Sequence, residues 1–331
     1  MAGAGKKRSR VEDQLAELQV LASDPSSSEA RETIRASLKS GASLVAARAA
    51  KIVRDHAMDG FAGDLEAAFK RFLVDGVKSD PGCRAKLAAL EALDHGEHAD
   101  AEPFIAATRH IQMEPAWGPP VDTAVGVRSR GVMALARLGH PDLEIIAGDL
   151  LSDKESPVRQ ATADALAWNG QRGATGLLLL RWNLGDDDPM VLMACMTGVL
   201  ALAPDVALAR LRAQLFGADQ AAREAAIIVL AQSSKDPPLE LLLEYLPTVA
   251  LAADRASVWR ALGLHRSDRA LAVALETIAT GERSDAEAAI AGLSARRFEA
   301  GMRERVDAAS GRNQRCRLTA AVRAAFEPAT K

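Results

Sequence analysis

A thirteen-residue pattern of small, apolar and polar positions occurs twice in the middle of the chain. Residues 127–139 read VRSRGVMALARLG, and residues 158–170 read VRQATADALAWNG. Both copies begin with Val-Arg, carry Ala-Leu at the eighth and ninth positions, and end in Gly. The apolar positions recur at the spacing of one face of an α-helix, and a closing glycine suits the left-handed cap at a helix C-terminus. The pattern predicts a repeated helix with one buried face.

Diverged copies of this helix are spread along most of the chain. Taking their first positions as equivalent, the copies begin at Leu44, Cys83, Val127, Val158, Val191, Ala222, Asp254, Asp285 and Cys316. The spacing is nearly constant from Val127 onward and longer before it. Each interval has room for a second helix, such as residues 141–153 and 206–217. A single hairpin of this kind cannot bury its apolar face alone, so the sequence predicts an all-α protein, a right-handed α-solenoid of about eight or nine helical hairpins.

Two sets of apolar residues are expected to form the core. One set occupies the same position of successive repeats and should be buried in register: Leu135, Leu166, Val199, Leu230, Leu262 and Leu293. The other is a stripe that should close the N-terminal end of the stack: Phe61, Leu65, Phe69 and Phe72.

The spacing also suggests how the chain is divided. Residues 1–10 are predicted to be a disordered basic tail and residues 11–112 a set of irregular repeats. Residues 113–123, MEPAWGPPVDT, form an insertion loop in which three prolines and a glycine oppose regular helix. Residues 124–326 are predicted to be the regular repeats and residues 327–331 a disordered tail.

Helical hairpins ending in V-R-x-x-x-x-x-A-L-x-x-x-G resemble HEAT-like repeats of the phycobilisome-lyase type. The resemblance covers roughly residues 40–326 at the level of pattern. The stretch RHIQMEPAWGPPVDTA is similar to one in uncharacterised bacterial HEAT-repeat proteins. The resemblance implies the solenoid fold but no activity. Some copies depart from the pattern, since Leu192 and Ala286 replace the second-position arginine.

Charge and composition narrow the class of protein. The net charge is −3, and only 4% of the residues are aromatic, so the core is expected to consist of Ala, Leu and Val. Residues 1–10 and 296–331 are basic, which leaves residues 11–295 with a net charge of −12. An acidic body argues against nucleic acid as a partner and favours another protein with a basic surface or peptide.

Cys83, Cys195 and Cys316 are far apart and odd in number, so each is interpreted as a buried thiol rather than part of a disulfide framework. The N-terminus lacks the apolar segment of a signal peptide, and the longest apolar runs are too short to span a bilayer. We therefore expect a cytoplasmic protein without a membrane segment.

Arginines recur at the second position of the repeat helix: Arg84, Arg128, Arg159, Arg223, Arg255 and Arg317. Such a row can bind phosphates. Acidic residues recur just before the arginines, as Asp153 does before Arg159, and this favours ion pairs that tie adjacent hairpins together.

The insertion loop provides the candidate partner-binding site, made of Trp117, Asp122, Arg128 and Arg130. Long loops that interrupt a regular fold are often functional, and Trp and Arg are enriched at binding hot spots. In the alternative interpretation, Trp117 folds back and fills the gap that the insertion leaves. The loop hypothesis predicts an exposed tryptophan, whereas the packing alternative predicts a buried one.

A polar turn, DHGEHADAE at residues 94–102, contains two histidines, and a third lies on the following helix. His95, His98 and His110 are weak candidates for metal ligands because their spacing matches no established motif. We therefore predict no metal and no cofactor.

Two function classes remain: a non-enzymatic protein-binding scaffold, which we favour, and an enzyme of the HEAT-like lyase or DNA glycosylase kind. Deoxyhypusine hydroxylase, which resembles this architecture, binds iron through His-Glu dipeptides, and the chain has none. The tryptophans and aspartate that a glycosylase groove requires have candidates in Trp117, Trp168, Trp182, Trp259 and Asp122. No residue can be assigned as a catalytic or bilin-binding group.

Overall fold

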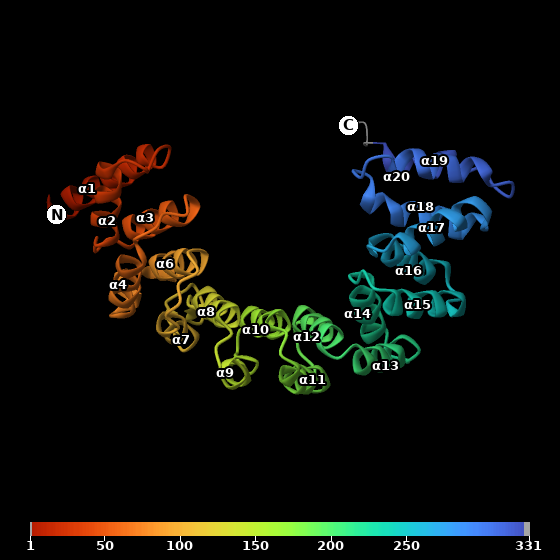
Figure 1. The fold of residues 1–331 in the computed structure, drawn as a ribbon, viewed down its shortest axis with the longest axis horizontal. Coiled ribbons are helices and arrows are strands. Elements are labelled where there is room, and N and C mark those ends of the chain that lie inside the picture. Colours follow the sequence, from red (N-terminus) through yellow and green to blue (C-terminus); the bar gives the residue numbers. More distant parts are fainter. Residues whose placement is uncertain (1, 328–331) are drawn as a thin grey trace. The chain divides into compact units, whose positions relative to one another are not determined.

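The computed structural model describes residues 2–327 of the chain, whose regular secondary structure is α-helix apart from short 3₁₀ turns and one two-stranded sheet (Figure 1). The chain divides into two compact units, one ending at Gly198 and the other beginning at Val199. This boundary falls within one helix, α12 (Pro189–Leu202), and not at the predicted insertion loop. The all-α prediction is confirmed.

The first part of unit 1 consists of helices and one 3₁₀ turn. They are α1 (Ala2–Leu21), α2 (Ser28–Leu38), α3 (Ser43–Asp55), α4 (Ala62–Leu73), α5 (Gly76–Ser79), the 3₁₀ turn η1 (Pro81–Cys83), α6 (Arg84–His95) and α7 (Glu102–Thr108). After the strands β1 (Met113–Glu114) and β2 (Val121–Asp122) come α8 (Val125–Leu138), α9 (Leu143–Leu150), α10 (Ser156–Asn169), η2 (Arg172–Ala174), α11 (Thr175–Leu184) and most of α12.

In unit 1 the repeat helices pack in chain order. Helix α3 lies against α6, α6 against α8, and α8 against α10. The second helix of each hairpin contacts the repeat helices beside it, as α4 does with α6 and α7 with α8 (Figure 1). The apolar face of each repeat helix is therefore covered by its neighbours, as the pattern predicts.

Unit 2 repeats this arrangement. It contains α13 (Pro204–Leu215), α14 (Gln220–Ala231), α15 (Asp236–Tyr245), η3 (Leu246–Thr248), α16 (Ala252–Leu264), α17 (Asp268–Thr280), α18 (Arg283–Leu293), η4 (Ser294–Arg296), α19 (Met302–Arg312) and α20 (Thr319–Phe326). Helices α14, α16, α18 and α20 pack in that order. The helices of residues 2–327 fall short of the length and apolar character that a membrane span requires.

The details of the repeat helix agree with its sequence pattern. Gly139 and Gly170 both have positive φ, 62° and 77°, at the C-termini of α8 and α10. The six residues predicted to be buried in register are each at most 1% exposed. Within α8, a methyl group added at Gly131 would lie 2.8 Å from the backbone oxygen of Phe104. The small residue in the motif thus lets α7 approach α8 closely.

The cysteine prediction holds at two of its three positions. Cys83 and Cys195 are buried, and burial raises the pKa of the Cys195 thiol to about 12. Cys316 is half-buried because it precedes α20 in a loop, where its sulfur lies 3.6 Å from Oδ1 of Asn313.

Two predictions about the chain divisions need correction. Residues 2–10, expected to be disordered, form the first part of α1; the stretch contains no proline, and its Ala, Lys and Arg residues favour helix, whereas Gly3 and Gly5 do not. Residues 113–123, expected to be irregular, contain a two-stranded antiparallel sheet in which Met113 pairs with Asp122 and Glu114 with Val121. Of the predicted C-terminal tail, residues 328–331 lie outside the described residues.

Ion pairs between repeats are present at three of the six second-position arginines. Each joins an arginine to an aspartate that lies just before, or at the start of, the next repeat helix: Arg128–Asp153, Arg159–Asp186 and Arg255–Asp285. Arg128 and Arg159 are buried, which makes them unavailable to an external phosphate. Arg223 instead donates to the backbone oxygen of Gly217 at 2.7 Å. The ion-pair interpretation is therefore confirmed for part of the row.

We expect Arg159→Ala to lower the free energy of unfolding by about 3 kcal/mol, the cost of removing one partner of a buried ion pair. The Asp186 carboxylate is fully buried and accepts hydrogen bonds from Arg159 at 2.6 and 2.8 Å, so the variant leaves it with Arg181 as its cationic partner and with the backbone N–H of Asp188 at 2.9 Å. Urea denaturation followed by circular dichroism measures the change. Lys78→Ala, which breaks an exposed pair with Asp75 in the same unit, should cost less than about 1 kcal/mol. Equal losses in the two variants would contradict a structural role for the buried pair.

Candidate functional site

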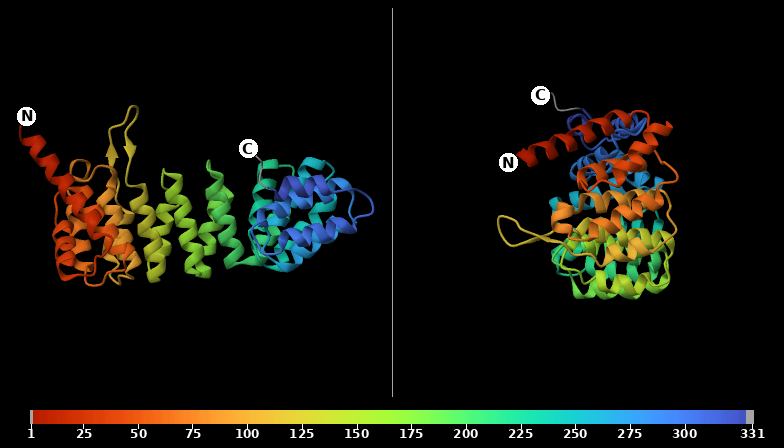
Figure 2. Two further views of the ribbon diagram at one scale, coloured as in Figure 1. Left: turned by 90° about the horizontal axis from the view of Figure 1, so that it is seen from above. Right: turned by 90° about the vertical axis from the view of Figure 1, so that its left-hand side faces the viewer.

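Residues 113–122 form a hairpin, here called the Trp117 hairpin, that projects beyond the helices of unit 1 (Figure 2). Trp117 lies between the two strands in sequence, and its side chain is fully exposed. The alternative in which Trp117 folds back to fill a gap is therefore wrong. Met113 and Val121 on the strands are also about half exposed, so the hairpin presents apolar side chains to solvent.

The carboxylate of Glu114 fixes the first strand to the body of unit 1. Its Oε1 accepts hydrogen bonds from the backbone N–H of Gly82, from Nε2 of Gln112 and from Oγ1 of Thr123, each at 2.7 Å. Burial works to raise the pKa of Glu114, but these three bonds hold it below its ordinary value. Glu114 thus bridges η1 and both sides of the hairpin base.

Asp122 fixes the second strand. Its Oδ1 accepts from the backbone N–H of Gln112 at 3.1 Å and of Ala124 at 2.9 Å, and its Oδ2 accepts from Nη1 of Arg128 at 2.7 Å. Burial works to raise the pKa of the Asp122 carboxyl, but the bonds from Ala124, Gln112 and Arg128 outweigh it and lower the pKa. The carboxylate is therefore held in its charged form by the fold.

Arg128 connects this base to the next repeat. Its side chain is 3% exposed and donates to Asp122, to the backbone oxygen of His110 at 2.9 Å, and to Asp153 through Nε at 2.8 Å and Nη2 at 3.1 Å. A guanidinium bonded in this way is not available to a partner. Arg128 and Asp122, predicted as contact residues, instead hold the hairpin in place.

A second buried ion pair lies below the hairpin. Lys86 and Asp80 have fully buried side chains 3.1 Å apart, and Nζ of Lys86 also donates to the backbone oxygen of Phe72 at 3.0 Å. The backbone oxygen of Asp80 accepts from Nε2 of Gln112 at 3.0 Å. The amide of Gln112 thereby joins this pair to Glu114, and so to the hairpin.

Arg130, the fourth predicted contact residue, lies away from this network. Its side chain is 39% exposed and makes a 3.2 Å ion pair with Asp94, which also accepts from Arg137 at 2.7 Å. Of the four predicted contact residues, the structure brings Asp122 and Arg128 together, and Trp117 is the one left fully exposed.

The three candidate histidines do not form one cluster. His95 is exposed, whereas His110 is half-buried with Nε2 3.4 Å from Oε1 of Gln112, and burial lowers its pKa. His98 is half-buried, and its Nε2 lies 2.9 Å from Oε1 of Glu66. The predicted set therefore separates into an exposed histidine, one beside the hairpin base and one beside a carboxylate of α4.

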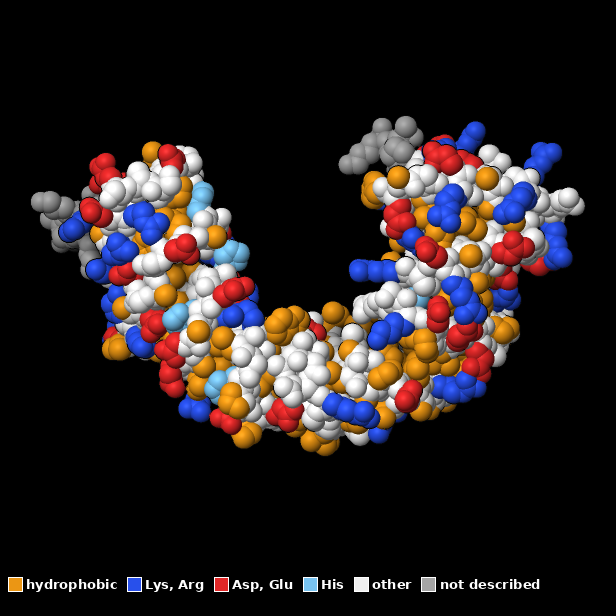
Figure 3. All heavy atoms as spheres, viewed as in Figure 1, with side chains coloured by type: hydrophobic (Ala, Val, Ile, Leu, Met, Phe, Trp, Pro, Cys, Tyr) orange, Lys and Arg blue, Asp and Glu red, His pale blue; other side chains and the backbone are white. Residues whose placement is uncertain are grey.

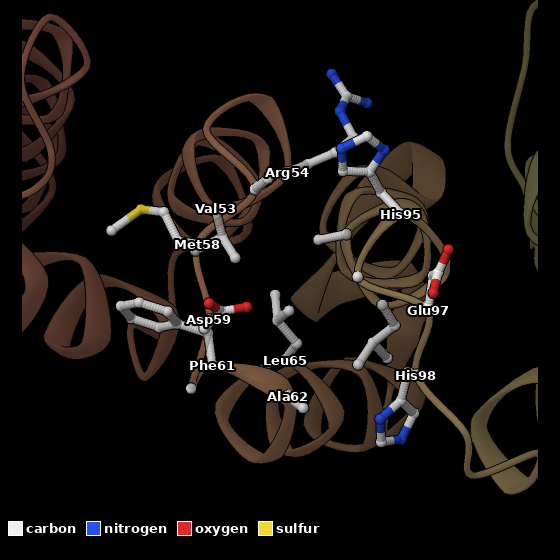
Figure 4. Close-up of a pocket in the computed structure, with 15 residues that line it drawn as sticks. Val53, Arg54, Met58, Asp59, Phe61, Ala62, Leu65, His95, Glu97 and His98 are labelled. Carbon is white, nitrogen blue, oxygen red and sulfur yellow. The ribbon is translucent and has the colours of Figure 1, made fainter.

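A pocket of about 310 Å³ lies between α3, α4 and α6. Its floor is apolar and includes Val53, Phe61 and Leu65, whereas Arg54 and His95 are at its rim (Figure 4). Figure 4 shows His95 and His98 on opposite sides, directed away from its centre. Arg54 is already paired with Asp55 and Glu91. Figure 4 draws the carboxylate of Asp59 toward the middle of the pocket, and a single carboxylate is not the convergent set of groups that catalysis requires.

Several of the residues considered for a glycosylase are unavailable to a substrate. Trp182 and Trp259 are buried within their own units, and Asp122 is bonded to Arg128. Trp168 and Trp117 are exposed. This gives the enzyme alternative no support from these five residues.

The sequence contains a signal for the hairpin that the helical spacing of apolar residues does not reveal. Short segments rich in apolar residues flank a loop containing Pro and Gly, a common arrangement in β-hairpins. The contributions of Glu114, Gln112 and the Asp80–Lys86 pair had no comparable signal, because these residues come together only when η1, α6 and the hairpin pack.

We expect Asp122→Asn to destabilise unit 1 at neutral pH by about 1–3 kcal/mol, the cost of leaving a buried hydrogen-bonding group poorly paired. Because the folded pKa of Asp122 is lowered, its stabilisation is present above the ordinary carboxyl pKa of about 4 and is lost as pH falls through the lowered value. Urea denaturation at a series of pH values should show the gap between variant and wild type narrowing below about pH 4. A gap independent of pH would mean that the charge of Asp122 is not what stabilises the base.

Comparisons with known proteins add little to this geometry. No family model matches the sequence, and no curated protein matches it. Among solved structures, the chain is similar to one in the complex of CpcE and CpcF of phycocyanin lyase from Nostoc sp. PCC7120, with 17% sequence identity and a TM-score of 0.37. The match covers 73% of this chain and 93% of that one.

Proposed function

We propose that this chain is a non-enzymatic binding protein that recognises a partner protein through the Trp117 hairpin. The observation that carries the proposal is a fully exposed tryptophan between two strands whose base is fixed by buried charged groups. Tryptophan is enriched at binding hot spots, and here its indole is accompanied by the exposed side chains of Met113 and Val121 on the two strands. The hairpin supplies the exposed anchor, and unit 1 supplies its rigid support.

The energetics of burial favour Trp117 as the central contact. An aromatic side chain covers about 150–250 Å² on burial, and at about 25 cal/mol per Å² this corresponds to roughly 4–6 kcal/mol of gross stabilisation. The bonds of Glu114 and Asp122 already order the hairpin, so less conformational entropy is lost on binding. The partner should therefore offer an apolar groove that accepts an indole.

Charge should contribute orientation more than affinity. Residues 11–295 carry a net charge of −12, which suits a partner with a basic rim around that groove. In the view of Figure 3, acidic and basic side chains are interspersed over both units, with no continuous field of one sign. Burial of the Trp117 side chain in the partner's groove is therefore expected to contribute more to binding than electrostatic attraction does.

We expect Trp117→Ala to abolish capture of the partner from a cell lysate while leaving the thermal midpoint of the protein within about 2 °C of the wild type, because the side chain makes no packing contacts to lose. Trp168→Ala is the matched control, since Trp168 is also exposed but lies on α10, away from the hairpin. That variant should retain the partner. Purified full-length wild-type protein added to the lysate should compete for the partner, and purified Trp117→Ala protein should not.

Two outcomes would overturn the proposal. One is a partner set unchanged in Trp117→Ala. The other is equal loss in both tryptophan variants, which would point to general exposed apolar surface and not to the hairpin.

A further inference from the structure

Three side chains with metal-ligating atoms converge beside α4, away from the hairpin. Glu66 lies on α4, and His98 and Asp100 lie in the loop between α6 and α7. Each offers one ligand atom, and these atoms all lie within 4.8 Å of one another. Sequence spacing gave no sign of this set, because Glu66 is more than thirty residues away from the other two.

The backbone fixes the positions of the two loop ligands. At the end of α6, Glu97 adopts a positive φ of 51°, and the N–H of His98 donates to the backbone oxygen of Leu93 at 3.0 Å. This is the hydrogen bond of a Schellman cap. Asp100 accepts from the N–H of Glu102 through Oδ1 at 3.0 Å at the start of α7. Since α4 packs against α6, Glu66 is brought to the same place.

His98 has an unused nitrogen in this cluster. Its Nε2 is buried and lies 2.9 Å from Oε1 of Glu66, but the two atoms are not aligned for a hydrogen bond. A buried polar atom without a hydrogen bond is costly, so it calls for a ligand or another explanation. In the neutral ring, Nε2 can present a lone pair to a metal ion.

The surrounding charges suit a cation. Glu66 and Asp100 contribute two carboxylates, and the loop follows the C-terminus of α6, the negative end of the helix dipole. The positive group in contact is Lys70, with Nζ 3.3 Å from Oε2 of Glu66, and its side chain is 61% exposed and free to move toward water. Arg137 donates to the backbone oxygen of His98 at 3.3 Å, but its charge is matched by Asp94.

We propose that Glu66, His98 and Asp100 bind a zinc ion, with water completing the coordination. One imidazole nitrogen and two carboxylate oxygens belong to the ligand types that zinc takes, at about 2.0–2.2 Å. A set of three protein ligands leaves an open position on the ion. This site is independent of the Trp117 hairpin, and the two proposals stand or fall separately.

The test is calorimetric titration of zinc into full-length protein previously treated with a chelator. We expect one ion to bind per chain. His98→Ala and Glu66→Gln should each weaken binding by at least about 10-fold, since even residues that only orient ligands cost this much. Cobalt substituted for zinc should give visible absorption bands in the wild type that are lost in His98→Ala.

His95→Ala is the matched control because His95 is exposed in the same turn and belongs to no such cluster among the described residues. It should bind zinc like the wild type. Circular dichroism without metal should show that His98→Ala remains folded. Absence of stoichiometric binding by the wild type, unchanged affinity in a folded His98→Ala protein, or equal weakening in His95→Ala would each overturn the assignment.

Discussion

The buried guanidinium of Arg128 is the interaction on which the hairpin depends. It binds a carboxylate at the hairpin base, the backbone just before the first strand, and a carboxylate of the next repeat. A charge buried this deeply is stable only if its hydrogen-bonding groups are satisfied. The repeat and the insertion therefore constrain each other: the stack supplies Asp153, and the hairpin supplies Asp122. An arginine of the repeat pattern has been used to attach an element that does not belong to the repeat.

The repeat architecture was predictable from sequence because it rests on local periodicity. Small and apolar residues at helical spacing, with glycine at the helix end, predicted both the helices and the buried register positions from Leu135 to Leu293. The pattern does not encode where compact units separate. The division at Gly198 falls in the interior of α12, nine residues after Pro189 at its start and with no insertion beside it.

The candidate site was predictable only in outline. The interruption of the repeat pointed to residues 113–123, and Trp117 is exposed there. The sequence shows that a residue is arginine, but not whether it will contact a partner or be buried in ion pairs. That difference depends on which carboxylates surround it after folding. Arg128 meets two of them and Arg130 one. The Glu66–His98–Asp100 cluster was equally hidden, since it needs α4 packed against the end of α6.

The ion pairs between repeats also bear on how the chain reaches its native state. Arg128 pairs with a residue 25 positions later, Arg159 with one 27 positions later and Arg255 with one 30 positions later. Native contacts of such short sequence separation close only short loops and so involve little entropic delay. Each hairpin can be completed as soon as its successor has been synthesised. During translation, the growing end of the stack would then be the main apolar surface left uncovered.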